Sequence, residues 1–280
     1  MASNKIRKFL FFFDSRATFS YSNNIIKIFK QNKKNYQVIV SGNYLEKISK
    51  IDNQIFKKNN IKINYKIKFG SPKEKPYTWP KVFGQAMIRY SKILNKIKPE
   101  IVVLTGDRIE TLAFCITCSY MNIPVAHVQA GDKSGHIDDL ARSAIAKFSH
   151  IHFAPSRMAC NRLRQWGEDN KRIFFTGAPQ LDDLKLKTKS DKNYYVIIFH
   201  PVLNEQNKIK KQLNSLIDAI NETNSKAVWI YPNTDMGFKL IITKLKKIKN
   251  KNIKLISNLE RSDFFKIIKP IIRNNWKFLL

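Results

Sequence analysis

The chain has 280 residues, of which 43% are hydrophobic and 12% aromatic, so it can bury a sizeable core and is not a disordered chain. Its 51 Lys and Arg against 21 Asp and Glu give a formal net charge of +30. The excess is mainly Lys (40 against 11 Arg) and accompanies 37 Ile and 26 Asn; because all three residue types have A/T-rich codons, base bias explains the charge, and we expect no specific nucleic-acid partner.

Short apolar runs alternate with segments of helical period from the start of the chain. Each run is nearly all apolar and ends in polar residues or Gly, which is typical of buried parallel strands. The expected strands are 9–13, 36–40, 101–104, 124–128, 150–154 and 173–176, and the expected helices are 21–31, 79–97, 109–121, 137–149 and 156–166. This alternation predicts a parallel sheet covered by helices on both faces.

A second alternation follows a charged segment, 184–193, that contains no aromatic residue and is expected to be a linker. Its expected strands are 194–199, 227–231 and 253–256, and its expected helices are 205–221, 236–249 and 261–268. The sequence therefore predicts an α/β fold of two Rossmann-like halves, an N-terminal domain at 1–183 and a C-terminal one at 194–280. The second half reads as incomplete, because it has three strands and no Gly after Gly237 to form a phosphate-binding loop.

Cysteine usage and apolar run length narrow the class of protein further. Three cysteines argue against a disulfide framework. Cys115 and Cys118 form a C-x-x-C pair without a second ligand pair, so we expect two buried helix residues and no metal site. The run at 9–13 is too short for a signal sequence or a membrane span, so we expect a cytoplasmic protein.

Polar residues of catalytic type follow several expected strands. Asp107 and Arg108 follow the strand 101–104, and Gln129 follows 124–128. Asp138 and Arg142 are four residues apart and so share a helix face. Each has an ordinary structural explanation as a cap or a surface ion pair.

The second half repeats the pattern. His200 follows the strand 194–199, and Asn233 and Asp235 follow 227–231. Because the carboxyl ends of parallel strands meet at one edge of a sheet, these residues together favour a binding or catalytic site in a cleft over a purely structural role.

The order and spacing of these motifs resembles the UDP-N-acetylglucosamine 2-epimerase family, and within it the hydrolysing branch that feeds sialic and legionaminic acids. The motifs are Gly106-Asp107-Arg108, His127-Val128-Gln129-Ala130-Gly131, Ile137-Asp138-Asp139 with Arg142, Gly177-Ala178-Pro179 with Asp182, His200-Pro201-Val202, and Tyr231-Pro232-Asn233 with Asp235. The resemblance covers nearly the whole chain. It implies two Rossmann-like halves of the B-type glycosyltransferase architecture.

The resemblance also implies the chemistry and the partners. UDP leaves C1 as the C2 proton is removed, and water then adds to the 2-acetamidoglucal to release an N-acetylmannosamine-type sugar. Asp107 and Asp138 become acid/base candidates, Arg142 would hold Asp138 ionised or touch the substrate, and His200 would lie near the diphosphate. The substrate contacts implied are Arg16, Arg108, Gln129, Asn233 and Asp235. The implied partner is a UDP-sugar, with no cofactor, metal or membrane span, and homo-oligomerisation stays open.

Departures from the family pattern keep alternatives open. The segment 14–20 reads Asp-Ser-Arg-Ala-Thr-Phe-Ser where the family reads Gly-Thr-Arg-Ala-Asp-Tyr-Gly, and Asp14 is expected to repel the phosphates. Gln129 replaces an acidic residue, and Ser143 replaces a histidine. The sequence ends before the Gly-Asn-Ser-Ser-rich nucleotide loop, as after a premature stop, so we expect weak or absent activity. A non-catalytic remnant or assembly partner and a B-type glycosyltransferase are the alternatives.

Overall fold

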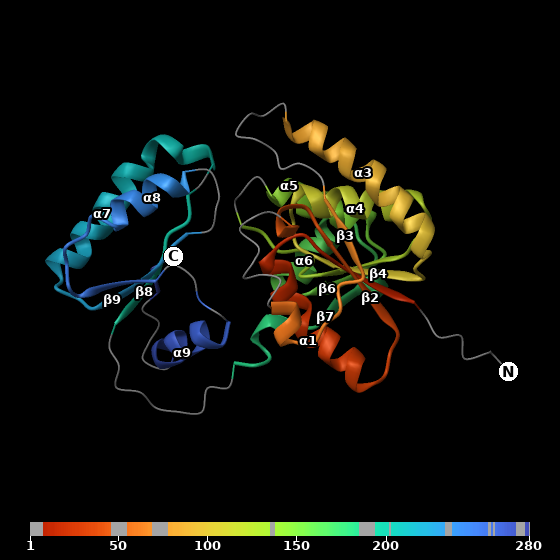
Figure 1. Cartoon of the computed structure of the whole chain (residues 1–280), viewed down its shortest axis with the longest axis horizontal. Coiled ribbons are helices and arrows are strands. Elements are labelled where there is room, and N and C mark those ends of the chain that lie inside the picture. Colours follow the sequence, from red (N-terminus) through yellow and green to blue (C-terminus); the bar gives the residue numbers. More distant parts are fainter. Residues whose placement is uncertain are drawn as a thin grey trace. The chain divides into compact units, whose positions relative to one another are not determined.

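The chain forms two compact units, Met1–Asp182 and Asp183–Leu280, each an α/β arrangement (Figure 1). The computed structural model describes residues 8–45, 55–68, 78–134, 138–184, 194–201, 203–232, 237–256, 259, 261–272 and 278–279. Of the expected linker at 184–193, only Leu184 falls within these ranges.

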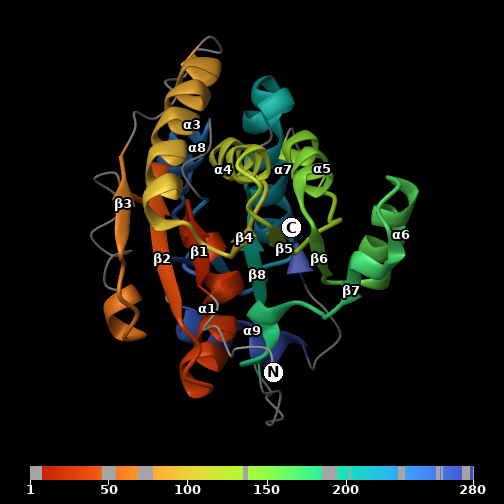
Figure 2. The ribbon, with the colours of Figure 1, turned by 90° about the vertical axis from the view of Figure 1, so that its right-hand side faces the viewer.

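The first unit is built on a seven-stranded sheet in which all strands are parallel, in the order β3-β2-β1-β4-β5-β6-β7, as Figure 2 shows across its view. The strands are β1 Phe9–Phe13, β2 Tyr36–Ser41, β3 Tyr65–Ile67, β4 Ile101–Thr105, β5 Val125–Val128, β6 Ile151–Ala154 and β7 Ile173–Phe175. Six of them match the expected runs to within a residue or two at their ends. The sequence reading missed β3, which has only three residues and no long apolar run.

Strand β1 shows why an all-apolar strand is central in the sheet. Leu10 and Phe12 pack into a core with the helices α3 Thr78–Ile97, α4 Ile109–Tyr120 and α5 Asp138–Phe148. Phe11 and Phe13 pack on the opposite face against helix α1 Arg16–Gln31. All four side chains are fully buried. Because both faces are covered, an alternating polar pattern would leave polar groups in one core or the other.

Helix α1 begins at Arg16, five residues before the expected start at 21. Ser15 is its N-cap: the Ser15 Oγ accepts from the Thr18 backbone N–H at 3.3 Å, and the Thr18 Oγ1 accepts from the Ser15 backbone N–H at 3.2 Å. This capping box satisfies two backbone donors that would otherwise lack partners. The segment after β1 is therefore a helix start and not a loop.

The remaining elements of the first unit lead to β7, the last strand at one edge of the sheet. Helix α6 Arg157–Gln165 begins after its N-cap Ser156, whose Oγ accepts from the Ala159 backbone N–H at 3.1 Å. Short 3-10 turns lie at Gly42–Leu45, Asn170–Arg172 and Pro179–Leu181.

Cys115 and Cys118 are fully buried on α4, which confirms the expectation that they are core residues.

The second unit holds a four-stranded parallel sheet in the order β10-β9-β8-β11. Its elements are β8 Tyr195–Ile198, a 3-10 turn Leu203–Lys208, α7 Ile209–Glu222, β9 Ala227–Ile230, α8 Phe238–Leu245, β10 Ile253–Ile256, α9 Arg261–Ile272 and β11 Phe278–Leu279. The expectation of three strands was wrong, because β11 pairs with Val196 and Ile197 of β8. Trp229 is fully buried in the core that β9 forms with α7 and α8.

The two sheets share a topology. In both, the first strand along the chain lies between the second and a later strand, as β3-β2-β1-β4 and β10-β9-β8-β11 show. The loops after β1 and β4 therefore leave the first sheet on either side of a topological switch point. In open α/β sheets, ligands bind at the carboxyl ends of the strands beside such a point.

Candidate active site

The turn after β4 carries the first candidate residues. Gly106 has a positive φ of 98°, and a Cβ built there would lie 2.7 Å from the Cγ2 of Thr18, so only glycine lets the turn lie against α1. The His127 Nε2 lies 3.2 Å from the Gly106 carbonyl. Burial, together with the nearby His152, lowers the pKa of His127 to about 3, so the ring is neutral and its Nε2–H donates to this carbonyl.

Arg142 joins this turn to the start of α5. Its guanidinium pairs with the carboxylate of Asp107 and, through Nη1, with the Asp139 Oδ1 at 2.7 Å. The same Asp139 oxygen accepts from the Ser134 backbone N–H at 2.9 Å and from the Ser134 hydroxyl at 3.0 Å. The Arg142 side chain is 11% exposed and the Asp107 side chain 27%, so the cluster is mostly enclosed with one carboxylate open to solvent.

Tyr21 on α1 belongs to the same neighbourhood. Burial and the negative charge of Asp107 raise the pKa of its hydroxyl, and the positive charge of Arg142 opposes this rise. The phenol therefore stays protonated at neutral pH and can donate a hydrogen bond. Sequence reasoning missed Tyr21 because the helix was expected to begin there, with no reason for that residue to face β4.

A second polar group lies behind this cluster. Asp14, at the end of β1, is fully buried, and its Oδ2 accepts from the Thr111 hydroxyl of α4 at 2.5 Å. Burial, and next to it the charge of Glu110, raise the pKa of Asp14 to about 6. The carboxyl is held by threonines within the protein and is not exposed at the surface. That it repels bound phosphates stays a prediction.

Gln129 begins the turn after β5. It has a positive φ of 64° and is 8% exposed, and its Nε2 donates to the Gln180 Oε1 at 2.6 Å. Amide pairs of this kind carry no proton to transfer. Gln180 comes from the Pro179–Leu181 turn, and although the motif at 177–182 includes this turn, the sequence did not single out Gln180 itself.

The structure brings some of the predicted residues together. Asp107 and Arg142 are in direct contact, and Asp138 is the first residue of α5, one position before the Arg142 partner Asp139. The sequence paired Arg142 with Asp138 and did not predict its contact with Asp107, which lies 35 positions away. Arg108 precedes α4, and its Nε lies 3.5 Å from the Glu110 Oε2.

The other predicted site residues either lie wholly or partly outside the described ranges or belong to the second unit. Arg16 is the first residue of α1, and its side chain lies outside the described part of the chain. His200 is exposed in the second unit, two residues after β8. Asn233 and Asp235 lie outside the described residues.

Groups of metal-ligating side chains and long apolar helices were both sought in the described ranges. Within them, no three His, Cys, Asp or Glu side chains gather in a way that would hold a metal ion. The helices described there include none with the length and apolar character of a membrane span.

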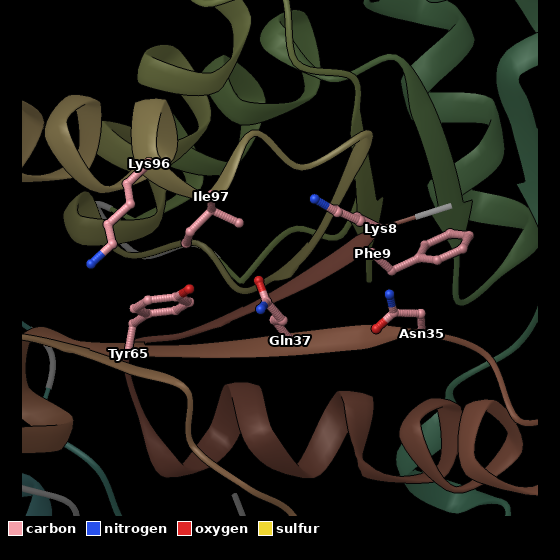
Figure 3. A pocket seen from close by; sticks show the side chains of 7 residues that line it. All are labelled: Lys8, Phe9, Asn35, Gln37, Tyr65, Lys96 and Ile97. Atoms are coloured by element: carbon pink, nitrogen blue, oxygen red, sulfur yellow. The ribbon is translucent and has the colours of Figure 1, made fainter. Parts of the chain in front are cut away.

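A shallow pocket of about 200 Å³ opens at the other end of the sheet (Figure 3). It is lined by the amino ends of β1 to β3 and the end of α3, including Lys8, Gln37, Tyr65 and Lys96. It therefore lies away from the Asp107–Arg142 cluster, which is at the carboxyl ends of the strands.

Comparison with known proteins decides the family. A model of the family described as UDP-N-acetylglucosamine 2-epimerase matches residues 27–271. The chain belongs to this family. It is 30% identical over 274 residues to the UDP-N,N'-diacetylbacillosamine 2-epimerase (hydrolyzing) of Legionella pneumophila, covering 92% of this chain and 73% of that protein.

Two further family members bear on function and fold. The GDP/UDP-N,N'-diacetylbacillosamine 2-epimerase (hydrolyzing) of Campylobacter jejuni is 31% identical over 216 residues, which are 70% of this chain and 56% of that protein. The Neisseria meningitidis UDP-GlcNAc 2-epimerase, solved bound to UDP-GlcNAc, shares the fold with a TM-score of 0.78 at 18% identity, over 93% of this chain and 75% of that one. The chain thus spans only part of the length of these family members.

Proposed function

We propose that this epimerase-family chain is a hydrolysing UDP-sugar 2-epimerase that acts on UDP-GlcNAc or a UDP-diacetamido sugar. The observation that carries the proposal is the contact of Arg142 with Asp107 and Asp139, which gathers two carboxylates and a guanidinium beside the topological switch point of the first sheet. The named activities of the relatives from L. pneumophila and C. jejuni support it.

The proposed reaction needs a base near C2 and polar or charged groups that bind the diphosphate. The C2 proton of a UDP-N-acetyl sugar is not next to a carbonyl group, so it cannot be removed by simple enolisation. In the proposed elimination, a base takes the C2 proton, the C–H electrons form the C1=C2 double bond, and the C1–O electrons leave with UDP. Water then adds its hydroxyl to C1 and a proton to C2 from the opposite face, which inverts that centre.

The described residues suit these roles in different ways. Asp107 is the most suitable base, because the Arg142 guanidinium fixes the orientation of its carboxylate while the carboxylate stays partly open to solvent. Asp138, at the start of α5, is the proposed second acid/base group. Tyr21 can donate a hydrogen bond near Asp107, a role that the sequence did not suggest.

Binding of the diphosphate is assigned to the basic and polar motif residues. Arg108 and Arg16 flank the switch point from the turns after β4 and β1. We assign His200, Asn233, Asp235 and Gln129 to substrate or diphosphate contact on their motif positions alone. The released sugar would be of the N-acetylmannosamine type, from which sialic or legionaminic acids are made.

The test follows UDP release from UDP-GlcNAc and from a UDP-diacetamido sugar, with proton NMR of the product in D2O. The proposal expects UDP together with a C2-inverted sugar that carries deuterium at C2. The variant Asp107→Asn should lose at least about 100-fold in turnover, since it removes the base. The matched control Asp218→Asn changes an exposed carboxylate on α7 and should leave turnover unchanged. Release of UDP without deuterium at C2 would exclude the elimination route.

A second candidate function is favoured by the Gln129–Gln180 amide pair. Where the family motif has an acid, this chain has a group that transfers no proton, which suits a non-catalytic protein that binds the nucleotide sugar. Under this alternative, calorimetry would detect binding of UDP, and no UDP would be released from either sugar.

A further inference from the structure

Buried polar contacts around Asp14 join the two turns that flank the switch point. The Thr111 hydroxyl of α4 donates to the Asp14 Oδ2 at 2.5 Å, and the Thr18 Oγ1 of α1 lies 3.3 Å from the Asp14 Oδ1. The Thr105 hydroxyl at the end of β4 donates to the Thr18 carbonyl at 3.0 Å. Through these contacts, the first turn of α1 and the turn that carries Asp107 and Arg108 hold a fixed position relative to each other.

Two charged residues, Glu110 and Arg108, act electrostatically on Asp14. Glu110, 2% exposed in the first turn of α4, places its Oε2 at 3.5 Å from the Arg108 Nε. The positive charge of Arg108 lowers the pKa of Asp14, against the effects of burial and of Glu110. Arg108 therefore has the buried Glu110 carboxyl group beside it, and its charge acts on Asp14.

The sequence departures at positions 14 and 18 are reciprocal. In the related motif, Gly-Thr-Arg-Ala-Asp-Tyr-Gly, the first residue is glycine and the fifth is acidic. Here the first is Asp14 and the fifth is Thr18, and these two side chains are in contact. A residue at the end of β1 and one four positions later, on the first turn of α1, therefore reach the same place. One carboxyl group is present in either arrangement.

We propose that Asp14 supplies, from the end of β1, the carboxyl group that the related motif carries four residues later, and that it is a positioning residue for the turn after β4 that carries Asp107 and Arg108. The inference rests on the proposed function, because Arg108 is assigned there to the substrate. Asp14 itself is fully buried and touches no substrate. It acts by holding the first turn of α1 against α4, through its contacts with Thr18 and Thr111.

The test is an exchange of the two residues in the full chain. Asp14→Gly removes the acceptor of the Thr111 hydroxyl, and Thr18→Asp alone places two carboxyl groups in contact, so each should lower kcat/KM at least about tenfold. The double variant should recover to within about threefold of the parent. Recovery is favoured locally, since an acidic side chain at position 18 suits a capping box with Ser15.

The variant Asp14→Asn separates positioning from structural support. Asparagine keeps one acceptor oxygen, but its NH2 group replaces the second, so the Thr18 and Thr111 hydroxyls cannot both donate to it. At pH 7.5, KM should rise about 5- to 20-fold with kcat within about threefold, while the melting temperature rises because a buried charge is gone. A purely structural role predicts that stability and activity fall together, and that result overturns the proposal. The control Asp218→Asn should change neither quantity.

The outcomes also separate this inference from the proposed function. If the parent chain releases no UDP from either sugar, the proposed function fails, and the exchange is then read in melting temperature alone. Thr18→Asp should melt lower than the parent, and the double variant should melt above Thr18→Asp. A double variant no better than the worse single variant, in stability and in any activity present, overturns the proposal.

Discussion

Replacing the buried Asp14 by asparagine is expected to stabilise the chain at neutral pH by an amount that depends on pH. The pKa of this carboxyl rises from 3.8 to about 6 on folding, mainly because burial disfavours the charged form and Glu110 adds to the effect, while Arg108 and the hydrogen bonds from Thr111 and Ser15 oppose it. Each tenfold change in proton affinity corresponds to about 1.4 kcal/mol, so the ionised Asp14 costs the folded state about 3 kcal/mol.

The sign follows from which state holds the proton. Below pH 3.8 both folded and unfolded chains carry protonated Asp14, and the cost is absent. It grows as the pH rises to about 6 and is constant above that value. Because asparagine does not titrate, the free energy of unfolding of Asp14→Asn minus that of the parent should rise by about 2 kcal/mol between about pH 4.5 and about pH 8.

The assay is urea or calorimetric unfolding of the parent and Asp14→Asn across this pH range. Taking the difference cancels groups that titrate alike in both proteins, and Asp218→Asn, which removes an exposed carboxylate on α7, serves as the control. A difference between parent and variant that stays flat from about pH 4.5 to about pH 8 would refute the reasoning. It would mean that the folded protein stabilises the ionised Asp14 carboxylate as well as water does.

Three other substitutions test the remaining features. Arg142→Lys should lower kcat about 100-fold in the UDP-release assay, because an ammonium group keeps the charge but not the planar fork that contacts Asp107 and Asp139 at the same time. Gly131→Ala should lower the free energy of unfolding by about 2–4 kcal/mol, since a Cβ there would lie 2.5 Å from a backbone oxygen of α6 at a φ of 78°. Its control, Gly177→Ala, has a similar φ of 75° but open space, so urea denaturation should show only about 1 kcal/mol, and equal losses would contradict the steric argument. Gln129→Glu should raise turnover at least about fivefold if an acid at this position contributes to catalysis, and an unchanged rate would count against that role.

The fold class could be predicted from the sequence because the strands are short, apolar and regularly spaced. A strand such as Phe9–Phe13 can only be stable with both faces covered, and that requirement leads directly to a parallel α/β sheet. The sequence missed Tyr65–Ile67 and Phe278–Leu279, because strands of two or three residues have too few positions to show a pattern and depend on pairing with a neighbouring strand.

The candidate site could be predicted only in part. The motif spacing identified Asp107 and Arg142, but an i,i+4 rule cannot tell Asp138 from Asp139 as the carboxylate that a long arginine side chain reaches. Tyr21 was missed because its neighbour Asp107 lies far away in the sequence.

The sequence by itself determined the α/β class and the family motifs, since both depend on residue types at local or fixed spacing. Only the tertiary structure decided the environment of Asp14. A polar residue at the end of a strand can face solvent or the interior, and the packing of α1 and α4 against it enclosed this carboxyl with Thr18 and Thr111. The contact of Arg142 with Asp107 was decided in the same way, because it required β4 and α5 to meet at one edge of the sheet.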